Sequence, residues 1–293
     1  MNAPARPVMR YHGGKARLAP WIVSFFPAHR TYVEPFGGAA SVLMAKAPSY
    51  AEIYNELDGE IVNVFAVLRD EHMAACLQRL CELTPFAREE FERAYEPADD
   101  PVEQARRTLI RSWMGHGSSG LRGHKTGFRA NPDREHSTAM DNWATWPPQI
   151  PAFTARLKRV AIENRDAFDF VDMHDKPGRL LYVDPPYVFA TRSQKRVGND
   201  LYHGYRHELT DDQHVALLDR LCQHRGMIVL SGYPSALYES RLEGWVRFEK
   251  EARADRGLAR TEVVWINPAC AAALAREGRT THAQQLGLLG IGA

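Results

Sequence analysis

Several features are scarce or missing in this sequence. No apolar run in its 293 residues approaches the roughly 20 residues that a membrane helix needs, and residues 1–10 contain no apolar core of a secretion signal. The four cysteines form no C-x-x-C pair, which argues against a metal site or a disulfide framework. We therefore expect a cytoplasmic protein with reduced thiols, no bound metal and no membrane contact.

Net charge is also nearly absent, at +1, and by itself does not indicate a nucleic-acid partner. Its distribution is uneven, because residues 106–129 hold six Arg or Lys and no Asp or Glu. Residues 191–207 hold four Arg or Lys against one Asp. Two local basic segments favour an anionic partner, although a solvated surface with uneven charge would give the same counts.

Apolar runs of strand length alternate with helical patterns, which predicts an α/β fold with a mostly parallel sheet. The rhythm breaks at residues 81–156, where Trp113, Trp143 and Trp146 are expected to be core residues. We predict one domain from residues 1–80 and 157–293 with this insertion. Residues 31–47 are expected to form a strand, a glycine-rich turn and a helix, and further strands are expected at 51–56, 159–163, 179–183, 226–233, 245–252 and 261–267; helices are expected at 18–27, 58–80, 86–95, 101–114, 166–173 and 210–225 and at the start of the tail after Cys270, with no clear period over 115–150.

The segment 34-EPFGGAAS-41 places an acid and a glycine-rich turn between a strand and a helix. Glycines let the backbone turn tightly against a ligand, although the same turn can simply join two elements. Glu56 ends the next strand, where an acid can accept hydrogen bonds from ribose hydroxyls. No G-x-G-x-x-G run is present, which favours a nucleoside-type ligand without a pyrophosphate. The loop 11-YHGGK-15 could bind an anionic group or lie on the surface.

The segment 181-LYVDPPY-187 ends a buried strand with an acid, two prolines and an aromatic ring. Proline fixes φ and lacks an N–H, so this group is rigid at the edge where α/β sheets bind ligands. The Asp184 carboxylate and the Pro185 carbonyl could accept both protons of an exocyclic amine and localise its lone pair. The Tyr187 ring could stack on the base, a contact of about 1–3 kcal/mol. A strand-ending turn is the alternative.

Together these motifs resemble the Dam-type DNA adenine-N6 methyltransferases, with 54-YNELDGEIVN-63 and 162-IENRD-166 also in the expected order. The resemblance implies a Rossmann-like methyltransferase sheet of about seven strands, S-adenosylmethionine as cofactor, and methyl transfer to an adenine flipped out of double-stranded DNA. Ala40 departs from the family, which usually has glycine there. The implied cofactor-binding residues are Tyr11, Lys15, Glu34, Phe36, Gly37, Gly38, Glu56, Asp166 and Asp184; the implied catalytic residues are Asp184, Pro185, Pro186 and Tyr187.

The family carries its target-recognition domain at the position of the insertion, which makes the basic segments candidate DNA contacts. The loop 191–207 is interpreted as closing on DNA or on the flipped base. The candidate DNA-binding residues are Arg111, Arg122, Lys125, Arg129, Arg192 and Lys195.

Three alternatives stay open: a methyltransferase for another amine, such as cytosine N4, RNA or a protein glutamine; a DNA-binding module without turnover; and a nucleotide-dependent oxidoreductase. The enzyme is expected in the cytoplasm of a bacterial or phage-infected cell, as a monomer or weak dimer. A cognate restriction enzyme is a further partner that the resemblance allows.

Overall fold

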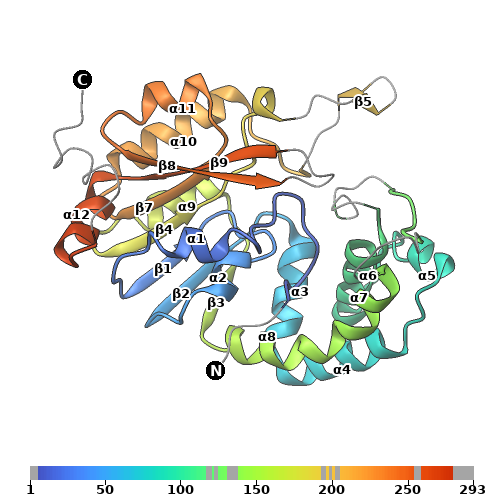
Figure 1. The fold of residues 1–293 in the computed structure, drawn as a ribbon. Coiled ribbons are helices and arrows are strands. Elements are labelled where there is room, and N and C mark those ends of the chain that lie inside the picture. Colours follow the sequence, from blue (N-terminus) through green and yellow to red (C-terminus); the bar gives the residue numbers. More distant parts are fainter. Residues whose placement is uncertain are drawn as a thin grey trace.

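The fold is built on one seven-stranded sheet (Figure 1). The computed structural model describes residues 6–116, 121, 125–130, 138–192, 196–197, 200–201, 205–253 and 259–279. The strand order is β3-β2-β1-β4-β7-β9-β8, parallel from β3 to β7, with β9 antiparallel to both its neighbours. The strands are β1 Thr31–Glu34, β2 Ala51–Asn55, β3 Val160–Glu163, β4 Arg179–Val183, β7 Met227–Gly232, β8 Val246–Arg253 and β9 Ala259–Ile266. All seven predicted strands and the mostly parallel sheet are confirmed.

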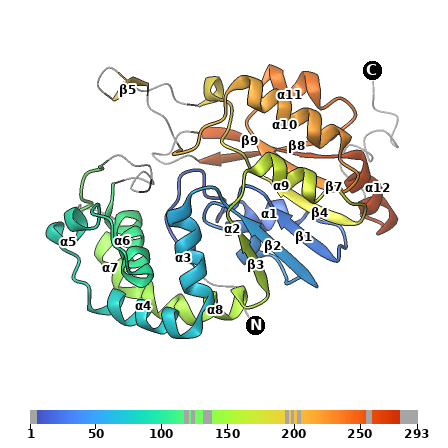
Figure 2. The same ribbon diagram turned by 180° about the vertical axis from the view of Figure 1, so that it is seen from behind.

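Helices cover both faces of the sheet, so its strands carry apolar residues on both sides. Along β4, Leu180 and Tyr182 face one cluster of buried side chains, and Leu181 and Val183 face the other. The first face packs against α1 (Ala19–Val23), α2 (Ser41–Ala45), α3 (Gly59–Arg69) and α12 (Pro268–Arg276); the second packs against α9 (Ala167–Met173), α10 (Asp211–Gln223) and α11 (Ala236–Arg241) (Figure 2).

The predicted helix at 58–80 is wrong in its continuity, because the chain forms α3 and then α4 (Glu71–Leu83). Asp70 separates them with an extended backbone (φ −84°, ψ 123°), and its carboxylate accepts a hydrogen bond from the Met73 N–H at 2.8 Å. A carboxylate at an N-cap satisfies a backbone donor that the helix leaves free. The break turns α4 away from the sheet and into a separate helical layer (Figure 1).

This helical layer lies beside α3, next to the sheet (Figures 1 and 2). It contains two helices that the sequence pattern did not reveal, α7 and α8. Trp113, Trp143 and Trp146 are at most 5% exposed in its interior, which confirms their expected core role. One buried cluster continues from the sheet into this layer. The layer consists of α4, α5 (Arg88–Arg93), α6 (Pro101–Met114), α7 (Ala139–Thr145), the 3₁₀ turn Pro147–Gln149 and α8 (Ile150–Leu157).

Helix α4 (Glu71–Leu83) crosses the predicted domain border at residue 81, so the helical layer begins before that border. The division into two domains stays a prediction. Two very short strands, β5 (Arg196–Val197) and β6 (Asp200–Leu201), pair antiparallel in the loop after β4. Within the described residues, no helix is both long and apolar enough to cross a bilayer. The same residues contain no group of three or more His, Cys, Asp or Glu placed to hold a metal ion.

Candidate active site

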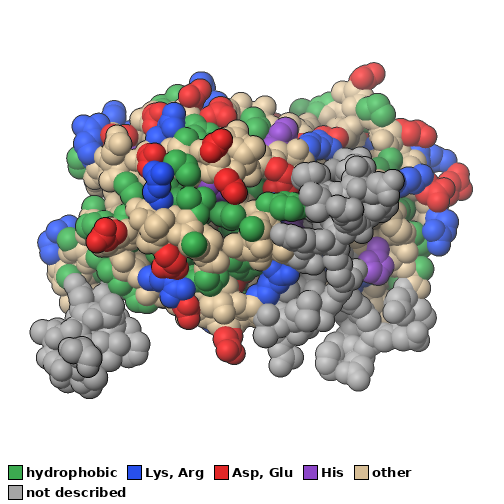
Figure 3. All heavy atoms as spheres, turned by 90° about the horizontal axis from the view of Figure 1, so that it is seen from above, with side chains coloured by type: hydrophobic (Ala, Val, Ile, Leu, Met, Phe, Trp, Pro, Cys, Tyr) green, Lys and Arg blue, Asp and Glu red, His purple; other side chains and the backbone are tan. Residues whose placement is uncertain are grey.

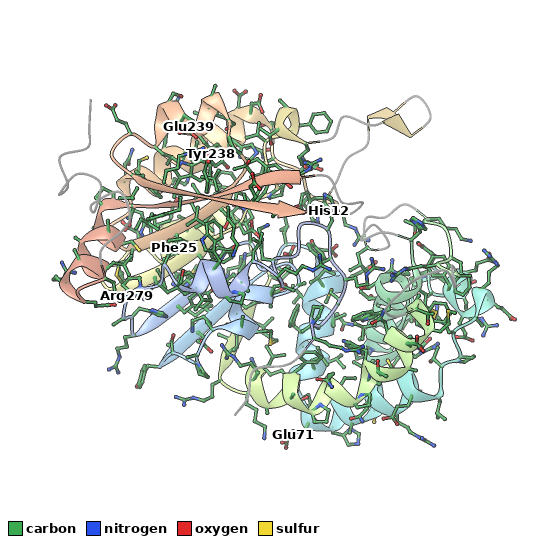
Figure 4. All side chains as sticks on the ribbon, viewed as in Figure 1. His12, Phe25, Glu71, Tyr238, Glu239 and Arg279 are labelled. Carbon is green, nitrogen blue, oxygen red and sulfur yellow. The ribbon has the colours of Figure 1, made fainter. Side chains whose placement is uncertain are left out.

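The candidate site is a cavity at the carboxyl ends of β1, β2 and β4. The strand order changes direction between β1 and β4, and such a switch point opens a ligand crevice in α/β sheets. The cavity holds about 900 Å³ including its open mouth. Figure 4 places His12, which lines the cavity, at the opposite end of the sheet from Arg279. All nine predicted cofactor-binding residues line it: Tyr11, Lys15, Glu34, Phe36, Gly37, Gly38, Glu56, Asp166 and Asp184.

The glycine turn forms the bridge between β1 and α2. Gly37 donates its N–H to the Asn55 carbonyl at 2.8 Å, and a Cβ on Gly37 would lie 2.1 Å from the Tyr54 ring. Gly38 has φ +47°, which favours glycine, and its carbonyl accepts the Tyr54 hydroxyl at 2.6 Å. Ala40 also has a positive φ, of 52°, yet it is fully buried and does not line the cavity. Alanine in place of the family's usual glycine at residue 40 therefore affects the backbone conformation before α2 and not the lining of the cavity.

Glu56 is held as a fixed acceptor at the end of β2. Its two carboxylate oxygens accept hydrogen bonds from the Gly38 N–H at 2.8 Å and from the Asp58 N–H at 3.0 Å. Burial raises the pKa of Glu56, and these backbone donors partly offset that rise. Asp166 is fixed in a similar way, because it caps α9 and accepts the Phe168 N–H at 2.8 Å. Both acids thus keep their orientation without a ligand.

A buried ion pair joins Lys15, in the loop 11–15, to Asp184, which directly follows β4. The Lys15 ammonium lies 3.0 Å from Asp184 Oδ1 and donates to the Gly13 carbonyl at 2.8 Å. Burial raises the pKa of Asp184, and Lys15 opposes that rise. Burial lowers the pKa of Lys15, but the carboxylates of Asp184 and Glu262 outweigh it and hold the pKa above its usual range. The ammonium therefore keeps its charge and fixes one oxygen of Asp184.

Tyr187 lies behind this pair and is only 5% exposed. Its hydroxyl donates to Glu262 at 3.0 Å, and its ring packs edge-on against Tyr233 with 4.5 Å between centroids. The Lys15 ammonium lies 4.6 Å from the ring centroid, over one face. Of the four predicted catalytic residues, Asp184 and Pro186 line the cavity, whereas Pro185 and Tyr187 are buried beside it. The stacking role of Tyr187 stays a prediction.

Glu34 ends β1 with a second buried carboxyl group. It is 2% exposed and accepts the Tyr32 hydroxyl at 2.9 Å. Burial raises the pKa of Glu34 to about 8, against a lowering by the Tyr32 hydrogen bond, and the nearby Asp184 adds to the rise. This carboxyl group therefore changes protonation near neutral pH, which the sequence motif could not show.

Three lining residues that were not predicted individually come from the loop 191–207: Tyr205, Arg206 and His207. Arg206 pairs with Asp58 at 2.9 Å and with Glu60 at 3.4 Å, across the cavity mouth. The only sequence signal was the basic character of that loop, since the acids that hold Arg206 are about 150 residues earlier in the chain. The closing movement of the loop stays a prediction.

The predicted DNA contacts separate into buried and exposed residues. Arg111 is 5% exposed and forms an ion pair with Glu60, and Arg129 is 7% exposed. Both side chains are buried in this structure, and their assignment as DNA contacts stays a prediction. Arg192 binds Glu208 through two hydrogen bonds, of 3.0 and 2.6 Å. Lys125 is exposed, while Arg122 and Lys195 lie outside the described residues.

Among the described residues on the face seen in Figure 3, Lys and Arg side chains are interspersed with Asp and Glu and form no single dominant patch. The fold and the cavity nevertheless agree with one family. The model of the D12 class N6 adenine-specific DNA methyltransferases matches residues 11–251 of the chain. The chain belongs to this family. It is a DNA adenine-N6 methyltransferase of EC class 2.1.1, and its cofactor is S-adenosylmethionine.

Solved structures give a weaker likeness to this methyltransferase. A conserved hypothetical protein from Streptococcus pyogenes is 11% identical with a TM-score of 0.35, over 86% of this chain and 94% of the other. A SAM-dependent methyltransferase from Agrobacterium tumefaciens is 11% identical with a TM-score of 0.39, over 87% of this chain and 62% of the other. No curated protein matches the sequence.

The polar groups that line the cavity of the methyltransferase suit S-adenosylmethionine. Carboxyl groups of Glu34, Glu56, Asp166 and Asp184 line it, and these favour a ligand that carries cations and hydroxyl donors. The cations Lys15 and Arg206 each already pair with a carboxylate, so they form no phosphate cradle. At the turn, Gly38 would bring a Cβ to 3.0 Å from the Tyr11 ring. The residues therefore fit the cofactor.

Proposed function

We propose that the methyltransferase acts on an adenine flipped out of double-stranded DNA and holds its N6 amine at Asp184. The observation that carries the proposal is the position of Asp184, which ends β4 on the wall of the same cavity that Glu56 and the glycine turn line. A base inside the duplex cannot present its amine to such a cavity, so the enzyme must extrude it. Tyr205, Arg206 and His207, at the end of the loop 191–207, line this cavity.

Asp184 and Pro185 are assigned to the amine. The Lys15 ammonium lies 3.0 Å from Oδ1 of Asp184, and we assign the Asp184 carboxylate to one amine proton and the Pro185 carbonyl to the other. Two acceptors on one amine localise its lone pair, which is otherwise delocalised into the purine ring. The gain is positioning and electrostatic preorganisation.

S-adenosylmethionine, when bound, supplies an electrophilic methyl group on its sulfonium sulfur, and the sulfur keeps the electron pair of the broken bond. Glu56 is assigned to the ribose hydroxyls, because both its oxygens are already oriented by backbone donors. Asp184 stabilises the positive charge that develops on N6. The methylated amine then loses a proton readily, so no strong general base is required of the chain.

We assign target recognition to residues 81–156, most of the helical layer. The support is its position beside the cavity and the exposed Lys125, whose ammonium lies 5.8 Å from the Tyr95 ring centroid. Phosphate contacts from such cations position a protein on DNA, while base contacts select the sequence. Sequencing of methylated DNA would report the modified base together with its sequence context.

The test is Asp184→Ala in single-turnover methylation of an adenine-containing duplex with labelled cofactor. We expect methyl transfer to fall by about two orders of magnitude or more, because the amine loses its charged acceptor, while calorimetry still detects cofactor binding. Asp212→Ala, at an exposed position in the first turn of α10, is the matched control and should keep full activity. Near-normal transfer by Asp184→Ala would end the assignment.

A further inference from the structure

Glu262 is a buried glutamate on the antiparallel strand β9, and it contacts the candidate active site through Tyr187. Glu262 belongs to β9, which follows the motifs of the sequence by more than 70 residues, and it does not line the cavity. It is 9% exposed and the next residue, Val263, is fully buried. A carboxyl group in such surroundings is costly unless it has a partner. Its partner is the hydroxyl of Tyr187, at 3.0 Å.

Tyr187 is thereby held from three directions. Glu262 anchors the hydroxyl, Tyr233 packs against the ring at 4.5 Å, and the Lys15 ammonium lies over the ring face at 4.6 Å. The bond to Glu262 gives the hydroxyl a defined direction, and the same hydroxyl helps to lower the pKa of Asp184 by hydrogen bonding. Removing it would let the ring turn, since aromatic and cation–π contacts are less directional.

The ring orientation affects the reacting groups through the backbone. Only two prolines separate Tyr187 from Asp184, and proline has a single narrow range of φ. A shift of the Tyr187 main chain is therefore less readily absorbed before it reaches the Pro185 carbonyl and Asp184, because both intervening φ angles are fixed. Lys15 couples the same two residues on the other side, because it contacts both the ring and the carboxylate.

We propose that Glu262 is a positioning residue for methyl transfer, which sets the orientation of the segment 184–187 through the hydroxyl of Tyr187. The inference rests on the proposed role of Asp184 at the amine. Glu262 touches neither the cavity nor, in this assignment, the substrate. Its role is to keep the two acceptors at the spacing that the amine requires.

The experiment measures single-turnover methylation by Glu262→Ala, Glu262→Gln, Tyr187→Phe and the double variant Glu262→Ala/Tyr187→Phe. We expect Glu262→Ala and Tyr187→Phe each to slow transfer by about tenfold or more, because small displacements of reacting groups are costly. The double variant should be no slower than Tyr187→Phe, since the hydroxyl that Glu262 holds is already absent there. Glu262→Gln keeps an acceptor oxygen and should stay within about twofold of the wild type.

Cofactor dissociation constants and unfolding midpoints are measured on the same proteins. A positioning role predicts that the cofactor dissociation constant stays nearly constant while the transfer rate falls. Glu251→Ala is the matched control, because Glu251 is exposed on the neighbouring strand β8, opposite Thr261. It should leave the transfer rate unchanged.

Several results would overturn the inference. Wild-type rates for Glu262→Ala or Tyr187→Phe would do so, and so would additive losses in the double variant. Equal losses in Glu262→Gln and Glu262→Ala would assign the effect to charge instead of the hydroxyl bond. If Glu262→Ala fails to fold, Tyr187→Phe and Glu262→Gln decide. Failure of the wild type itself to methylate adenine, or full activity of Asp184→Ala, would instead refute the proposed function.

Discussion

At the scale of single residues, Gly37 shows how a side chain can be excluded by its neighbour. A Cβ there would lie 2.1 Å from Cε2 of Tyr54, a ring that is fully buried and bonded to the Gly38 carbonyl. Gly37→Ala must displace this ring, and overpacking of this kind costs about 1–3 kcal/mol of unfolding free energy. We expect weaker cofactor binding as well, because the turn shifts with the ring.

Calorimetric cofactor titration and urea unfolding check this prediction. Gly59→Ala is the control, since a Cβ at Gly59, the first residue of α3, meets no atom within 4 Å. That variant should bind the cofactor normally and lose no stability. Wild-type affinity and stability in Gly37→Ala would mean that the Tyr54 ring can move away freely.

Glu34 gives a prediction about pH. Burial raises the pKa of its carboxyl group to about 8 in the folded protein, above the ordinary value of 4.5. The folded state therefore holds this proton more tightly than the unfolded chain. Its contribution to stability is fully present below pH 4.5 and is lost as the pH rises through about 8. Glu34→Gln cannot lose a proton and lacks this dependence.

Thermal unfolding of both proteins at several pH values between 5 and 9 measures the effect. The unfolding midpoint of the wild type should fall relative to that of Glu34→Gln as the pH rises. If the unfolding midpoints of the two proteins differ by a constant amount across this pH range, Glu34 is already ionised in the folded protein. A shift in the opposite direction would contradict the burial argument itself.

At the scale of elements, the sequence patterns predicted the strands and several helices, because these depend mainly on local sequence. The seven strands carry apolar residues in strand-length runs, and α6 was predicted at its observed bounds, 101–114. The break at Asp70 was missed because the apolar period continues through it. Only the cap that Asp70 makes with Met73 marks the end of one helix and the start of another. Both elements around residues 139–157 were missed because prolines and tryptophans obscure their short periods.

Contacts between distant elements were beyond the sequence pattern. Glu52 on β2 binds Lys46 at 2.5 Å and Arg156 of α8 at 2.5 and 3.0 Å, although Arg156 is 104 residues further along the chain. The site shows the same limit: the motifs identified the cavity lining, whereas the links from Glu262 to Tyr187 and from Arg206 to Asp58 come only from the fold. Spacing along the chain does not reveal such pairs.

The Glu52 cluster leads to a stability prediction for this element junction. Glu52→Ala would leave Lys46 and Arg156 buried without their counter-charge, and breaking a buried pair in this way costs about 3–5 kcal/mol. Urea unfolding should show that loss, and Glu163→Ala at the exposed end of the neighbouring β3 should show much less. A loss below about 1 kcal/mol, the usual value of a surface pair, would mean that water reaches the cluster.

At the scale of the whole molecule, a net charge of +1 gives little general attraction to DNA. Binding must then depend on where cations are exposed, and several arginines are held in ion pairs within the fold. Arg111 and Arg206 both pair with Glu60, which links α6 of the helical layer to the mouth of the cavity. Arg192 is held by Glu208 in the same region. Arg111 thus joins the helical layer to α3, and Arg206 joins the end of the loop 191–207 to the same helix.

In the insertion, we expect phosphates to bind the exposed Lys125 and Arg122, which lies outside the described residues. Arg122→Ala/Lys125→Ala should weaken duplex binding and reduce the slope of log affinity against log salt by up to about two, since each phosphate contact contributes close to one. Lys176→Ala/Arg225→Ala removes two cations near the amino ends of β4 and β7, at the edge opposite the cavity, and should leave the slope unchanged. Fluorescence anisotropy over a salt series measures both. An unchanged slope in the first double variant, with a reduced slope in the second, would place the DNA on the opposite edge of the sheet.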